Sequence, residues 1–197
     1  MIEIKYTGDA LWARIERAVE NVKDRLHRVT QTLNSANVAY AVIGGNAVQH
    51  WVSQVDESVV RNTRDVDIIL KRHDLELAIE ALETAGFKFR HAAGVSMFLD
   101  GPNAKARDAV HVVFANEKVR AEYPEPVPNI DDYVLMGNAK TLPFEGLVRM
   151  KLTSFRDKDK VHLRDMISIG MIKESLLAQL SPELRRRMEV LIDDPNG

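Results

Sequence analysis

The sequence predicts an α+β (α/β) protein in which helices flank a mixed β-sheet, followed by a C-terminal helical region. Three observations predict this class: short apolar runs alternate with helical periodicity, one strand leads directly into a glycine pair and a helix, and the last quarter has helical spacing throughout. We expect a core over residues 1–143, which includes a long N-terminal helix. Residues 144–197 are expected to form a helical region packed on that core.

The first part of the chain alternates helices and strands. Apolar residues at steps of three and four predict helices, and short apolar runs predict strands. In chain order these elements are a helix over 9–36, a strand over 38–43, a helix over 46–52, a strand over 65–70 and a helix over 73–85. Gly86 is the expected C-terminal glycine of the last helix.

Further strands and then helices complete the predicted order. The segments are strands over 87–91, 95–99 and 109–115, helices over 144–155 and 160–169, and a last helix that opens at Ser181-Pro182. A turn at Gly101-Pro102-Asn103 separates the second and third of these strands. Three prolines at 124, 126 and 128 predict a stiff connector before the helical region.

Composition excludes several classes of protein. The chain has 197 residues, 45% hydrophobic and 28% charged, and no cysteine, so disulfide scaffolds and thiolate metal sites are excluded. A net charge of -2 argues against a general coat for nucleic acid. No apolar run approaches the roughly 18 to 20 residues needed to span a bilayer, and we expect a cytoplasmic protein with no membrane partner.

A glycine pair stands between a predicted strand and a predicted helix. Gly44 and Gly45 would let the backbone approach a phosphate closely, and the helix that follows from Asn46 would direct N–H groups at it. Glycine pairs also end strands in many folds with no ligand. Taken alone, the motif indicates a turn and only weakly a phosphate site.

Two aspartates open the next predicted strand. Residues i and i+2 of a strand point to the same face, so Asp65 and Asp67 should converge while Val66 and Ile68 point into apolar packing. Converging carboxylates suit a hard cation such as Mg²⁺. The alternative is a solvated strand end, with the aspartates paired to Arg61 or Arg64.

Together these motifs resemble those of the nucleotidyltransferase superfamily, the DNA polymerase β-like fold. The similarity is carried by residues 43–47 and 63–68, and more narrowly it is to AbiEii-type toxin nucleotidyltransferases. Residues 151–166 are similar to a basic helical segment of such proteins. The resemblance implies Mg²⁺ held by Asp65 and Asp67, and transfer of a nucleoside monophosphate from an NTP to a hydroxyl. It also implies a nucleotide held by Gly44, Gly45 and Asn46.

The sequence departs from the family at a third carboxylate, which is usually placed on a later strand. In the strand over 109–115 that position is His111, and Asp108 and Asp100 are nearby alternatives. A neutral imidazole can accept a proton near neutral pH, but it is a poorer Mg²⁺ ligand than a carboxylate. His111 is therefore a catalytic candidate and, alternatively, an ordinary histidine of the sheet face.

Basic residues supply the remaining candidates. Arg64, Lys151 and Lys158 are expected to contact the nucleotide, with Lys151 nearest the phosphates. If one helix continued through Asp165, Lys151 and Lys158 would share a face. If the helix breaks near Asp157, a second helix begins there. In either arrangement, the alternative to a nucleotide contact is that these charges form a solvated face.

Three functions fit these residues. The first is an Mg²⁺-dependent nucleotidyltransferase acting on RNA, a protein or a small molecule. The second is a module of the same fold that binds a nucleotide or partner without catalysis, and the third is a metal-dependent phosphohydrolase. The narrower resemblance implies the toxin of a toxin–antitoxin pair, with an antitoxin as partner.

Overall fold

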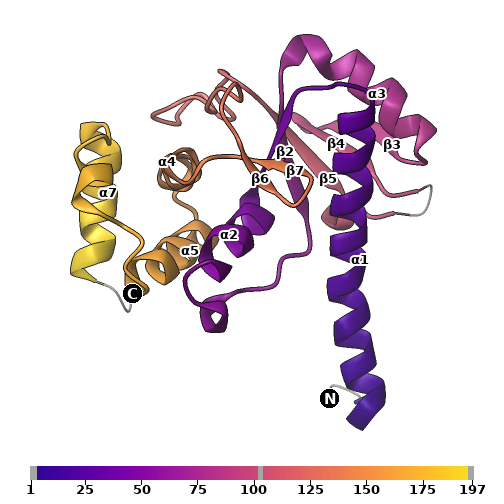
Figure 1. Cartoon of the computed structure of the whole chain (residues 1–197), viewed down its shortest axis with the longest axis horizontal. Coiled ribbons are helices and arrows are strands. Elements are labelled where there is room, and N and C mark those ends of the chain that lie inside the picture. Colours follow the sequence, from indigo (N-terminus) through magenta and orange to yellow (C-terminus); the bar gives the residue numbers. More distant parts are fainter. Residues whose placement is uncertain (1–3, 102–103, 195–197) are drawn as a thin grey trace.

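The computed structural model describes residues 4–101 and 104–194. These residues form a seven-stranded mixed sheet with helices on both faces (Figure 1). The strands are β1 (Tyr40–Ile43), β2 (Val66–Leu70), β3 (Lys88–Ala92), β4 (Val95–Leu99), β5 (Val110–Phe114), β6 (Val134–Met136) and β7 (Ala139–Thr141). The α-helices are α1 (Gly8–Ser35), α2 (Gly44–Ser53), α3 (Leu75–Thr84), α4 (Phe144–Ser154), α5 (Asp157–Ser168), α6 (Glu174–Leu177) and α7 (Pro182–Asp193). The predicted fold class is confirmed.

Strand β2 lies at the centre of the sheet. The strand order is β3-β4-β5-β2-β1-β7-β6, with β2 parallel to β5 and antiparallel to β1. In this register Asp67 lies opposite Ile43 on one side and His111 on the other. The start of β2 therefore meets both the end of β1 and the start of β5.

Each face of the sheet carries its own apolar core. On one face, α1 and α3 pack on residues such as Val66, Ile68 and Val110. On the other face, α2, α4, α5 and α7 pack on Ile43 and Ile69. Figure 1 shows α1 on one side of the sheet and the α2, α4 and α5 group on the other. The side chain of Asp67, two residues before Ile69, belongs to the second face.

Helix α1 is only half covered by the rest of the molecule. Its C-terminal half buries Val22, Val29 and Leu33 against the sheet. Its N-terminal half extends beyond the sheet (Figure 1) and leaves the same apolar stripe exposed, with Trp12 63% exposed. None of the helices in the described part of the chain combines the length and apolarity that a bilayer crossing requires.

The structure also decides what the sequence left open and adds elements that it did not predict. Phe155 adopts a left-handed φ of 47°, which ends α4 and lets α5 begin at Asp157, so the basic segment is two helices. The β6–β7 hairpin was not predicted, because its strands have three residues each. Of the predicted turn at 101–103, Pro102 and Asn103 lie outside the described residues.

Candidate active site

Asp65 and Asp67 lie together at the start of β2. Val66 and Ile68 alternate with them and are fully buried in the core of the opposite face. Burial raises the pKa of Asp65, and the charge of Asp67 raises it further. Both carboxylates therefore project from one face of the strand and repel each other, a situation that a bound cation relieves.

Gly44 lies directly against Asp67. Its φ of +66° is in the left-handed region, and a Cβ placed on it would lie 2.0 Å from Oδ2 of Asp67. Only glycine fits this contact, for reasons of both conformation and space. The glycine bend and the acidic pair are thus one structural unit.

The first turn of α2 completes this unit. A Cβ on Gly45 would lie 2.6 Å from the Thr63 side chain, so the bend also packs on the segment before β2. Asn46 is buried, and its Nδ2 donates to the Asp65 carbonyl oxygen at 2.9 Å. The Asn46 side chain therefore holds the strand start in place. No side chain caps α2, and its first residue, Gly44, lies against the Asp67 carboxylate, which the positive end of the helix favours.

His111 occupies the neighbouring position on β5. Its Nδ1 lies 3.6 Å from Oδ1 of Asp67, and its Nε2 lies 3.1 Å from the Ala106 carbonyl oxygen. A carbonyl oxygen can only accept, so Nε2 carries the proton and Nδ1 faces the carboxylate. Contact with Asp67 raises the pKa of His111, and burial opposes that rise.

The two alternative acids, Asp100 and Asp108, lie in different surroundings from His111. Asp100 accepts from Arg25 at 3.2 Å and from Arg28 at 2.9 Å, so its carboxylate joins α1 to the end of β4. Asp108 lies in the 3-10 turn η3 (Ala106–Asp108) and contributes to the raised pKa of Asp65. Of the three candidates, His111 is the one whose strand register places it beside Asp67.

Basic side chains from the start of α5 face the acidic pair. Lys158, in the first turn of α5, is exposed and opposes the rise in the Asp65 pKa. Arg156, which precedes α5, lies close enough to Asp67 for the two charges to interact. Arg156 was not among the predicted site residues. Its only signal in the sequence was its place inside the basic segment.

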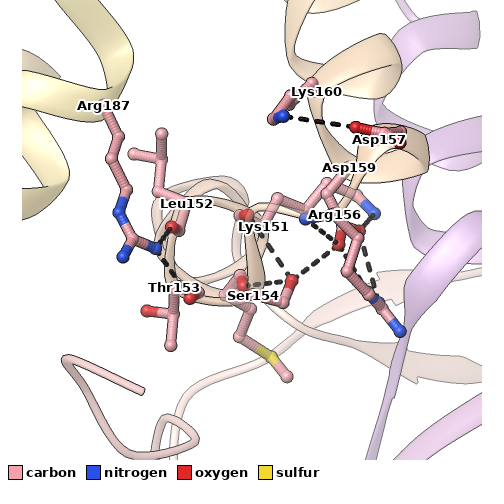
Figure 2. Close-up of polar contacts among 10 residues, drawn as sticks. Lys151, Leu152, Thr153, Ser154, Arg156, Asp157, Asp159, Lys160 and Arg187 are labelled. Carbon is pink, nitrogen blue, oxygen red and sulfur yellow. Dashed lines mark hydrogen bonds and ion pairs between the residues drawn. The ribbon is translucent and has the colours of Figure 1, made fainter. Parts of the chain in front are cut away.

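Lys151 is held in a closed network (Figure 2). Its Nζ donates to Asp159 at 3.2 Å, and only 5% of Lys151 is exposed. Asp159 also accepts from Ser154 at 2.7 Å and from Arg156 at 2.8 Å. Burial lowers the pKa of Lys151. Lys151 thus forms an ion pair inside the protein, whereas a phosphate contact would require this ammonium to leave Asp159.

The loop before β2 is fixed to α5. Arg61 donates to both carboxylate oxygens of Asp165, at 2.5 and 3.0 Å, and its carbonyl oxygen accepts from Gln49. Arg61 therefore does not neutralise the acidic pair. The backbone oxygen of Arg64 accepts from Arg25, while the Arg64 side chain is exposed next to Asp65.

The donor set fits an open cation site. Among the described residues, no three His, Asp or Glu side chains form a group that could hold an ion alone. Two carboxylates on one face of the strand, beside a bend too close to Asp67 for a Cβ, nevertheless suit a hard divalent cation whose other ligands come from a phosphate. Asp65 and Asp67 are the residues that would hold it.

Comparisons with known proteins agree on the fold. No protein-family model and no curated protein sequence matches this chain. An antigenic nucleotidyltransferase-like protein from Paracoccidioides brasiliensis superposes with a TM-score of 0.57 and 18% identity, over 91% of each chain. The antibiotic-resistance factor ANT(2'')-Ia gives a TM-score of 0.55 at 13% identity, over 89% of this chain and 91% of that one.

A second structure of ANT(2'')-Ia, in complex with adenylyl-2''-tobramycin, also superposes. Its TM-score is 0.55 at 12% identity, over 87% of this chain and 98% of that one. At such low sequence identities the similarity concerns the fold alone. The chain therefore has a nucleotidyltransferase-like fold.

Proposed function

We propose that the protein is a nucleotidyltransferase that moves a nucleoside monophosphate from an NTP to a hydroxyl acceptor, with Mg²⁺ as its cation. The observation that carries this proposal is the contact between Gly44 and the Asp67 carboxylate, which places the acidic pair against the bend that opens α2 and leaves no room for a Cβ. The nucleotidyltransferase-like fold supports it independently.

The residues around the acidic pair have different roles in this proposal. The N-terminal end of α2 and the side chains of Arg156 and Lys158 supply positive charge for the β- and γ-phosphates. When bound at Asp65 and Asp67, Mg²⁺ would act as a Lewis acid on phosphate oxygens. Arg64, exposed beside the pair, is available to the nucleotide or the acceptor.

The transfer itself is a displacement at the α-phosphorus. The acceptor oxygen forms a bond to phosphorus, the bond to the bridging oxygen breaks, and pyrophosphate leaves with that electron pair. The hydroxyl proton must go to a base, and Nδ1 of His111 is a nitrogen that faces Asp67. Because Nε2 is directed at Ala106, a proton accepted at Nδ1 would be held between His111 and Asp67.

Two similarities to other proteins bear on the class of acceptor. ANT(2'')-Ia has been seen with an adenylylated small molecule, which supports a small-molecule acceptor. The motif resemblance to AbiEii-type proteins supports RNA or protein as acceptor, action as the toxin of a toxin–antitoxin pair, an antitoxin partner and a cytoplasmic location. The acceptor, the toxin role, the antitoxin partner and the location are parts of the same proposal.

One observation favours a second function, a binding module without catalysis. His111 stands where the family usually places a third carboxylate, and in its protonated form it would reduce the negative charge of the pair through its contact with Asp67. Such a module would still bind an NTP but would transfer nothing.

Label transfer separates these functions. The full chain is incubated with Mg²⁺, an α-phosphate-labelled NTP and fractions of RNA, protein and small molecules. Transfer predicts label in one fraction together with pyrophosphate release. A phosphohydrolase would release labelled nucleotide and label no fraction. NTP binding with neither product would establish the binding module instead.

A further inference from the structure

A cavity of about 850 Å³ lies between the middle of α1 and the segment after β4. Arg14, Asn21 and Arg25 of α1 line one wall, and Asp100 and Asp108 line the opposite wall. Arg64 also lines it. Its volume is within the usual range for sites that bind a small molecule or a nucleotide, about 300 to 1,000 Å³.

The cavity lies next to the acidic pair. Arg64, which lines the cavity, directly precedes Asp65 in the chain. Arg25 donates to the Arg64 carbonyl oxygen at 3.3 Å, which holds this segment of backbone to the cavity wall.

The cavity and the proposed phosphate site lie toward opposite faces of the sheet. The glycine bend, α2 and α5 belong to the face of the Ile43 and Ile69 core, whereas α1 belongs to the face of the Val66 and Ile68 core. Figure 1 shows these two groups of helices on either side of the sheet. The cavity therefore approaches the acidic pair around the start of β2, where Arg64 lines it.

The charges of the cavity favour an anion. Among the described residues, three arginines and two aspartates line it, a surplus of one positive charge. Arg25 and Asp100 pair with each other at 3.2 Å. In the described part of the chain, neither Arg14 nor Arg64 forms an ion pair with a carboxylate. Guanidinium groups that lack such partners are well suited to bidentate binding of phosphate.

We propose that this cavity binds the acceptor, and that the acceptor is a hydroxyl compound carrying phosphate. The inference rests on the proposed nucleotidyl transfer and names its substrate class. A free ribonucleotide and the 3′ end of an RNA share this chemistry. A polycationic hydroxyl compound such as tobramycin does not, and its ammonium groups would be repelled by Arg14 and Arg64.

Binding to the full chain tests this. The protein is first saturated with a non-hydrolysable NTP analogue and Mg²⁺, so that the phosphate site is filled. AMP, a short RNA with a free 3′ hydroxyl, and tobramycin are then titrated separately. The variants are Arg14→Gln and, as a matched control, Arg17→Gln, which removes the same charge from α1 outside the cavity lining.

We expect AMP or the RNA to bind more tightly than tobramycin, and the tighter of the two identifies the source of the phosphate. Arg14→Gln should weaken that binding by about five- to tenfold, the loss of one charge-assisted hydrogen bond, while Arg17→Gln leaves it unchanged. Equal effects of the two substitutions, or preferential binding of tobramycin, would overturn the inference. If the analogue itself fails to bind, the proposed function fails with it. If the analogue binds and neither anion does, only the acceptor site is wrong.

Discussion

The chain contains the pattern Asp-x-Asp twice, and the two copies have opposite environments. In the first, Asp65 and Asp67 lie at the start of a strand and repel each other. In the second, Asp157 and Asp159 start a helix, and their side chains are 99% and 2% exposed. Residues two apart converge on a strand but lie about 200° apart around a helix. Secondary structure therefore decides which pair can act together on one ligand.

The two regions also differ in how their charges are balanced. Asp159 accepts from Lys151, Ser154 and Arg156, and these contacts outweigh burial and lower its pKa to about 2. The pKa of Asp65 is raised. A carboxylate satisfied by its own protein stabilises the fold, whereas one left in repulsion has charge to offer a ligand. The predictions below test this contrast.

The largest effect is expected from Asp67→Asn. It removes one of the two proposed metal ligands, so NTP transfer should fall by at least about 10²- to 10³-fold. Because the change relieves repulsion with Asp65 but also removes the contact with His111, the melting temperature should change little. Asp157→Asn is the matched control and should alter neither quantity. Full activity of Asp67→Asn would separate the acidic pair from function.

The opposite result is expected for Asp159→Ala. It leaves the Lys151 ammonium buried without its partner, which should lower the free energy of unfolding by about 3 to 5 kcal/mol. Urea denaturation measures this, and Lys151→Met combined with Asp159→Leu should recover part of the loss. If Asp159→Ala instead leaves stability intact and abolishes only NTP binding, the network belongs to the active site.

Gly44→Ala should combine strain with a clash. The left-handed φ and the overlap with Asp67 together should lower the free energy of unfolding by about 3 kcal/mol. Gly137→Ala isolates the strain, because Gly137 has a similar φ of +57° and nothing within 4 Å of an added Cβ. That control should lose only about 1 kcal/mol. Equal losses would mean that the bend and Asp67 are not in contact.

The smallest predicted effect is a loss of folding stability at low pH, caused by His162 in α5. Burial, assisted by the charge of Lys151, lowers the pKa of His162 to about 4, and its Nδ1 is buried without a hydrogen-bond partner. Between about pH 6.5 and 4 the unfolded chain binds a proton that the folded chain does not, so stability falls as pH falls.

Over this pH range we expect a loss of about 2 kcal/mol, allowing for solvent screening. His162→Gln should remove most of it in urea denaturation at matched pH values. An equal pH dependence in the variant would assign the effect to other groups.

Local patterns in the sequence predicted much of this molecule. The glycine bend and the acidic strand were predicted because each depends on neighbouring residues, and the structure brings them together. A break near Asp157 was among the alternatives, but the bonding of Lys151 to Asp159 was not predicted, because it depends on how α4 and α5 pack after Phe155.

Contacts between segments far apart in the chain could not be predicted from the sequence. Arg61 and Asp165 are 104 positions apart, and the cavity is lined by residues of α1, of the loop before β2 and of the segment after β4. The apolar stripe of α1 is continuous in the sequence, so its spacing predicts a helix without showing that only half of it is covered. Such features depend on tertiary packing, for which periodicity carries no signal.

The most direct test is the metal dependence of nucleotide binding, measured by calorimetry with each NTP in Mg²⁺ and in EDTA. We expect the wild-type chain to bind at least one NTP in Mg²⁺ and about tenfold or more weakly in EDTA, since Asp65 and Asp67 repel a bare triphosphate. In Asp65→Asn/Asp67→Asn this dependence on metal should disappear. Equal affinity of the wild type with and without Mg²⁺ would contradict the account.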